Sequence, residues 1–219
     1  MQILATILLI LWAVETIASF AVGCRVAYRF PLTSMTLLLR SGMYAVMALD
    51  WYTGGPASYR TGHLATAWAF RTLTILVCME SVWLMAQGIP QVRRFALATS
   101  LLFAGMGVLV AMVTGGWLHG AWVDRVLGNN VQAYRNLAVG CMVYLVANHW
   151  LYSRAKPTGE LATQHWRGTV VLVAALMVGY GVEDWGGRNR MVAAVVIGQY
   201  VVRVGSLASL WIWGTNKKA

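Results

Sequence analysis

Charged residues are scarce in this chain of 219 residues, and acidic residues are the scarcest of all. Only 11% of the residues are charged, and seven Asp and Glu stand against 17 Lys and Arg, which gives a formal net charge of +10. A globular domain in water carries roughly 25% charged residues, whereas 59% of this chain is hydrophobic. The shortage of charge argues against an ordinary water-facing surface and indicates a protein embedded in a lipid bilayer.

The basic residues do not form the patch that a nucleic-acid partner requires. They lie singly or in pairs between apolar runs, with no basic stripe or arm. Binding to a phosphate backbone needs such a cluster, so we expect no nucleic-acid partner. We interpret the positive charge as orienting the chain in a membrane.

Signatures of catalysis and of metal binding are also missing. Cys24, Cys78 and Cys141 lie in or beside apolar runs without a CxxC pair, so we expect neither a disulfide framework nor a zinc site. The spacings GxSxG, HExxH, GxxxxGK[ST] and GxGxxG do not occur. No lysine lies inside an apolar run, which argues against a retinal Schiff base. We therefore predict that the protein is not an enzyme and holds no metal.

Seven apolar runs are long enough to cross a bilayer. A helix needs about 20 apolar residues to cross a hydrocarbon core of roughly 30 Å. The first run contains Glu15 and lacks a basic leader, so we expect a retained span rather than a signal peptide. The predicted spans cover residues 2–24, 34–53, 63–87, 94–117, 131–152, 168–184 and 190–213. The predicted fold class is all-α: a polytopic integral membrane protein forming a seven-transmembrane-helix bundle, with residues 1–219 as a single transmembrane domain.

The connections between these spans differ in their content of basic residues. The odd-numbered connections and the C-terminus hold nine basic residues, and the even-numbered connections hold four. The nine are Arg25, Arg29, Arg93, Arg94, Arg154, Lys156, Arg167, Lys217 and Lys218. The positive-inside rule then places the N-terminus outside and the C-terminus in the cytoplasm. We expect a multi-pass protein of the inner (cytoplasmic) membrane.

Histidines and small residues give two further expectations. His63, His119, His149 and His165 lie near span ends. Two histidines on each side could ligate haem, but haem ligands are usually held on facing helices. Because His119 and His165 are predicted loop residues, we expect no haem cofactor. Small residues four apart let helices approach closely, which predicts that the fourth and seventh spans pack on neighbouring helices. The pairs are Gly107/Ala111, Ala194/Gly198 and Gly205/Ser209.

The most informative residues are the charges inside the predicted spans. Each costs at least about 2.5 to 3.5 kcal/mol at mid-bilayer and normally faces the bundle interior with a partner. At 1.5 Å per residue, Glu15 and Glu80 lie roughly 14 and 12 Å from the cytoplasmic ends of their spans. Arg40 and Arg203 lie roughly 10 and 16 Å from theirs. We therefore predict one charge layer in which each glutamate lies within about 4 Å of Arg40 or Arg203.

Neighbouring polar residues extend this layer. Gln199 and Ser206 share a helix face with Arg203, and Tyr44 follows Arg40 by one turn. The predicted binding or polar network is Glu15, Arg40, Glu80, Gln199 and Arg203. A secondary network nearer the outer side is predicted from Asp50, Arg71 and Arg135.

The functional interpretation follows from the charge layer, and alternatives stay open. The leading hypothesis is a membrane protein that binds or conducts an ion or small solute through the Glu/Arg layer. One alternative is a structural or accessory subunit of a larger membrane complex, in which the same charges fix helix contacts. Another is an accessory membrane protein of a phage or mobile element. Expected partners are the lipid bilayer and a homo-oligomer or larger membrane complex.

Overall fold

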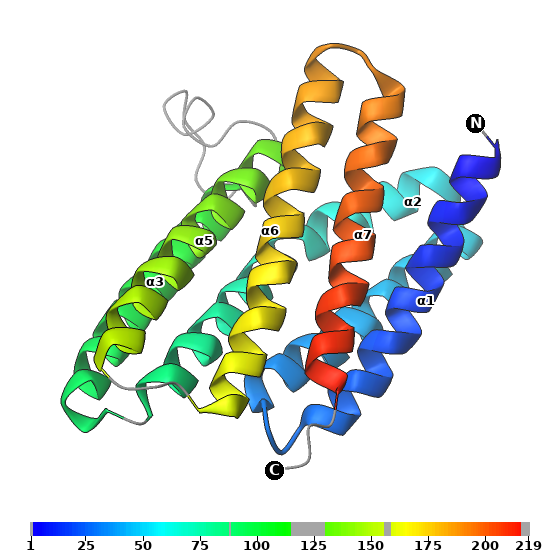
Figure 1. Ribbon diagram of the computed structural model, residues 1–219. Helices are drawn as coiled ribbons and strands as arrows, with labels where there is room; N and C mark the ends of the chain where they lie inside the picture. The colour runs from blue at the N-terminus through cyan, green and yellow to red at the C-terminus, as the bar shows by residue number, and fades with distance from the viewer. Residues whose placement is uncertain (1, 88, 115–129, 156–158, 216–219) are drawn as a thin grey trace.

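The computed structural model describes residues 2–87, 89–114, 130–155 and 159–215, and all of its regular structure there is helical. The six described helices are α1 (Gln2–Val26), α2 (Pro31–Ala86), α3 (Pro90–Thr114), α5 (Asn130–Ala155), α6 (Glu160–Arg188) and α7 (Val192–Gly214). No strand occurs within these ranges (Figure 1). The predicted all-α class is confirmed.

Two helices are long and apolar enough to cross a membrane. They are α6 and α7, whose most apolar 18-residue windows have mean hydropathies of 1.3 and 1.5. Both lie where the sequence predicts a span, although α6 begins eight residues earlier than the predicted 168–184. Within the described residues, α6 and α7 are the spans that length and composition support.

Helix α2 joins the predicted second and third spans and turns back on itself. A straight helix of 56 residues would be about 84 Å long. The backbone amides of Leu32 and Thr33, however, lie 2.9 and 2.6 Å from the carboxylate of Glu80 near the other end of the same helix. The predicted break in the helix between residues 53 and 63 is wrong, because α2 is helical throughout Pro31–Ala86. The two arms of this helix nevertheless run antiparallel (Figure 1). Gly54, Gly55 and Pro56 fall between the predicted arms, and helices usually bend at such residues.

The turns of the bundle gather at two opposite ends. The connections after α1 and α2 lie at one end with the last turn of α7, and the start of α1 and the α6–α7 connection lie at the other (Figure 1). Gln164, near the start of α6, donates hydrogen bonds to the carbonyl oxygens of Ile212 and Thr215 at 2.7 and 2.8 Å. We call the end that contains the last turn of α7 the C-terminal end, and the end that contains the start of α1 the N-terminal end. The helical segments thus alternate in direction, as the predicted spans require.

Small residues bring α6 and α7 into close contact. A Cβ atom built on Gly179 would lie 2.7 Å from the carbonyl oxygen of Gly198, and one on Gly198 would lie 2.5 Å from that of Gly179. Gly205 meets Ala175 of α6 in the same way. Close packing of the seventh predicted span against a neighbour is therefore confirmed. The other predicted pair, Gly107 and Ala111, lies outside the described side chains.

Candidate functional site

Glu15 is the centre of a buried ion-pair cluster that joins three helices. Its side chain, on α1, is fully buried with 0% exposure. Oε2 accepts a hydrogen bond from Arg203 Nη1 of α7 at 2.6 Å, and Oε1 forms an ion pair with Arg40 Nη2 of α2. The prediction that Glu15 pairs with Arg40 or Arg203 is confirmed, and the structure shows both pairs. One carboxylate therefore bridges α1, the first arm of α2, and α7.

Hydroxyl groups complete the surroundings of the two guanidinium groups. Tyr44 Oη accepts hydrogen bonds from Arg40 Nε at 3.1 Å and from Arg203 Nη1 at 2.9 Å. Both guanidinium carbons also lie 5.2 Å from the centre of the Tyr44 ring, within the range of cation–π attraction. Arg40 Nη1 donates to Ser206 Oγ at 2.9 Å. We call Glu15, Arg40, Tyr44, Arg203 and Ser206 the arginine cluster.

Polar contacts continue from the arginine cluster along α7 toward the N-terminal end. Gln199, one turn before Arg203, donates a hydrogen bond to Glu183 Oε2 of α6 at 2.5 Å. Glu183 also lines a cavity of about 330 Å³, together with Asp184 and Arg188. Gln199 and Arg203 thus share the helix face that the sequence predicts, and this face leads to a cavity. Glu183 was not among the predicted network residues, because it lies at the end of the predicted span 168–184, close to its polar flank.

Glu80 belongs to a different cluster and has different partners from those predicted. Its side chain is 4% exposed. Its carboxylate accepts hydrogen bonds from the amides of Leu32 and Thr33 and lies 3.3 Å from Nε2 of His165. The prediction that Arg40 or Arg203 pairs with Glu80 is wrong, because depth along a helix does not fix rotation around it. Glu80 pairs with backbone amides instead of an arginine. These N–H groups belong to the first turn of α2, where they have no partner within the helix and where the helix dipole also favours an anion.

His165 holds this second cluster together through both of its ring nitrogens. Nε2 lies 2.7 Å from Thr33 Oγ1, and Nδ1 lies 3.3 Å from Thr169 Oγ1. The Thr169 hydroxyl donates to the carbonyl oxygen of His165 at 2.8 Å, and the indole N–H of Trp213 donates to the same oxygen at 3.2 Å. We call Glu80, Thr33, His165 and Thr169 the histidine cluster.

The position of His165 was misjudged from the sequence, which placed it in a loop. It lies in α6 and is fully buried, because the helix begins at Glu160. His149 stacks on Trp166 with ring centres 4.0 Å apart. The side chains of His63 and His119 lie outside the described part of the chain. In the ranges that are described, no three His, Cys, Asp or Glu side chains are grouped to hold a metal ion.

The secondary network is only partly visible. Arg135 Nη1 donates to Asp184 Oδ2 at 2.7 Å, and Asp184 also pairs with Arg188 one turn later at 3.0 Å. The partner of Arg135 is therefore a residue of α6 that was not assigned to the network. The side chains of Asp50 and Arg71 lie outside the described part of the chain.

Comparison of the chain with family models, curated proteins and solved structures found no match. The function is therefore inferred from the chemistry of the two clusters. The arginine cluster places guanidinium groups from two helices on one buried carboxylate. Guanidinium groups are permanent donors that match carboxylate and phosphate groups well. The histidine cluster offers a helix N-terminus that is already occupied by Glu80.

Proposed function

We propose that the protein is a multi-pass protein of the cytoplasmic membrane, with seven spanning segments, an external N-terminus and a cytoplasmic C-terminus. The apolar helices α6 and α7 support this proposal, as does the alternating direction of the helical segments (Figure 1). The end of α1, the start of α3 and the end of α5 lie at the end of the bundle where α7 also ends (Figure 1). These turns contain Arg25, Arg93 and Arg154, respectively. This is the arrangement that the positive-inside rule favours.

The orientation has a direct test. A fluorescent protein that matures only in the cytoplasm should be bright when it is fused to the C-terminus. A phosphatase that is active only outside the cytoplasm should be inactive at the same position. The opposite pair of results would overturn the orientation.

Within this bundle, the arginine cluster binds an ion or small solute. The observation that carries this proposal is the fully buried Glu15 carboxylate shared by guanidinium groups of α2 and α7. Burying such charges costs more than apolar packing would, and ionisable residues inside a membrane normally mark a binding or transport path. Gln199 and Glu183 extend the polar contacts to the cavity at the N-terminal end. That cavity is the proposed entrance.

The geometry also suggests how binding would change the bundle. Glu15 is the shared partner of α2 and α7. An anion that took its place on Arg203, or a cation that took the place of one arginine on Glu15, would break a contact between helices. Occupation of the site would therefore change how α1, α2 and α7 pack, as a conducting or sensing protein requires.

The test is flux through proteoliposomes loaded with indicators for protons, potassium or chloride. The wild-type chain should carry at least one of these ions, and Glu15→Gln should abolish that flux while the helical circular dichroism persists. Glu160→Gln is the matched control, because it removes the same charge at an exposed position in the first turn of α6. No flux in the wild type, or equal flux in Glu15→Gln, would overturn the solute role.

One observation favours a second function, that of a structural or accessory subunit. Both oxygens of Glu15 are occupied by guanidinium groups, so the cluster also acts as a clamp between three helices. In that case the wild type and Glu15→Gln would both show only background ion flux. Glu15→Gln would also release the chain from a larger complex during size-exclusion chromatography in mild detergent.

A further inference from the structure

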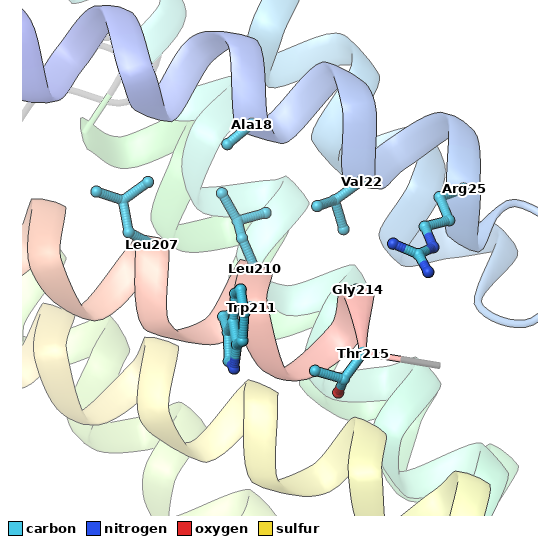
Figure 2. A pocket seen from close by; sticks show the side chains of 8 residues that line it. All are labelled: Ala18, Val22, Arg25, Leu207, Leu210, Trp211, Gly214 and Thr215. Carbon is cyan, nitrogen blue, oxygen red and sulfur yellow. The ribbon is translucent and has the colours of Figure 1, made fainter. Parts of the chain in front are cut away.

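A groove lies between the last turns of α1 and α7, apart from both buried clusters. It has a volume of about 540 Å³. Ala18 and Val22 of α1 form one wall, and Leu207 and Leu210 of α7 form the other (Figure 2). This groove therefore presents a mostly apolar surface toward the end of the bundle.

The groove is polar at one end only. Arg25 is the single charged residue of its lining, and its guanidinium group lies near Gly214 and Thr215 rather than near Leu207 (Figure 2). Arg25 is exposed and lies in the last turn of α1. From Ala18 to Arg25 the helix rises about 10 Å. An apolar channel with one cation at its mouth matches a molecule with an apolar chain and an anionic head.

We propose that this groove binds one anionic phospholipid, with an acyl chain along the apolar walls and the phosphate on Arg25. The inference depends on the membrane location in the proposed function, but not on solute binding by the arginine cluster. Charge complementarity supports it, because Arg29 follows α1 and Lys217 and Lys218 follow α7 in the sequence. Basic pockets between helices on the cytoplasmic side bind anionic headgroups.

A second groove provides an internal comparison. It lies between α3 and α5, has a volume of about 850 Å³, and has no charged residue among those that line it. Its larger apolar surface should accept acyl chains without preference for the headgroup. Preference for an anionic lipid should therefore depend on the groove beside Arg25.

Gly214 gives a way to fill the groove from α7. A Cβ atom built on Gly214 would lie 3.4 Å from Val22 Cγ2, which is ordinary van der Waals contact. Gly214→Leu should therefore fill the groove. Gly140→Leu is the matched control, since a Cβ atom there would meet nothing within 4 Å.

The experiment is native mass spectrometry of the full chain in detergent, titrated with phosphatidylglycerol or phosphatidylcholine. The wild type should retain phosphatidylglycerol more tightly than phosphatidylcholine. Arg25→Gln should weaken phosphatidylglycerol binding about fivefold, as expected for the loss of one basic residue at the headgroup. Arg154→Gln, which removes a charge from the last turn of α5, should weaken it less than twofold. Gly214→Leu should abolish the preference and Gly140→Leu should preserve it.

Three results would overturn the lipid site. Equal weakening by Arg25→Gln and Arg154→Gln would show attraction by net charge alone. Equal binding of the two lipids by the wild type would remove the role of the phosphate. Dissociation of a dimer by Gly214→Leu would assign the groove to a second copy of the chain. Release of the wild-type chain from membranes by alkaline extraction would instead refute the proposed membrane location. This extraction is a separate experiment from the lipid titration, so the two failures can be distinguished.

Discussion

Glu15 and Glu80 are both single carboxylates in apolar runs and both are buried, yet the protein accommodates them differently. Glu15 forms ion pairs with two permanent cations, Arg40 and Arg203. Glu80 is held by two backbone amides and by His165. The comparison shows that an apolar segment can carry a carboxylate either by ion pairing between helices or by using the free N–H groups at the start of a helix.

The two solutions should differ in energy when the carboxylate is lost. Removal of Glu15 takes away the carboxylate that the buried Arg40 and the partly buried Arg203 both contact. Their guanidinium groups stay charged at any accessible pH. Removal of the Glu80 charge in Glu80→Gln leaves one uncharged oxygen that still accepts a hydrogen bond from a backbone N–H group, and no permanent charge remains there without a counter-ion. Substitutions in the arginine cluster should therefore lower the free energy of unfolding more than substitutions in the histidine cluster.

The largest effect is expected for Glu15→Ala. It should lower the free energy of unfolding by about 3 to 5 kcal/mol, because a buried charge network loses its only described carboxylate. The measurement is denaturant unfolding in detergent micelles, followed by circular dichroism. A loss below about 1 kcal/mol would mean that water reaches the cluster.

An intermediate effect is expected for Glu80→Gln. The amide keeps the shape of the side chain and one acceptor oxygen, but its NH2 group takes the place of the second oxygen, so one of the two N–H groups of Leu32 and Thr33 loses its acceptor and the other loses a charged one. We expect a loss of about 1.5 to 3 kcal/mol in the same unfolding experiment. A loss as large as that for Glu15→Ala would point to a formal cation beside Glu80 and would contradict the comparison.

The smallest effect is expected for Thr169→Val, which keeps the shape of the side chain and removes its hydroxyl. The hydroxyl links His165 Nδ1 to the carbonyl oxygen of His165, so the loss should be about 0.5 to 1.5 kcal/mol. Thr99→Val is the control, because the Thr99 hydroxyl donates to the carbonyl oxygens of Phe95 and Ala96 in its own helix and belongs to neither cluster. It should change stability by less than about 0.5 kcal/mol.

Some of this architecture could be predicted from the sequence because helical geometry is regular. The 1.5 Å rise per residue placed Glu15, Arg40 and Arg203 at similar depths, and the structure brings all three together. The same regularity placed Gln199 and Ser206 on the Arg203 face, where both make contacts with other helices.

The partners of Glu80 could not be predicted, for two physical reasons. Depth does not determine which way a helix is rotated, so pairing by depth alone could not separate Glu80 from Glu15. The apolar run that defines the sixth span begins after His165, whereas the helix itself extends back to Glu160 through polar residues. His165 and Glu183 both lie near the polar ends of the same helix, where hydropathy does not locate boundaries.

The most direct test of the account is a pair of double-mutant cycles that share Arg203→Met. One cycle combines it with Glu15→Gln and the other with Glu80→Gln, each measured by unfolding in detergent. We expect a coupling energy of at least about 1.5 kcal/mol between Glu15 and Arg203, because they are in direct contact. Between Glu80 and Arg203 we expect a coupling within about 0.5 kcal/mol of zero. A Glu80–Arg203 coupling equal to that of Glu15 would contradict the separation of the two clusters.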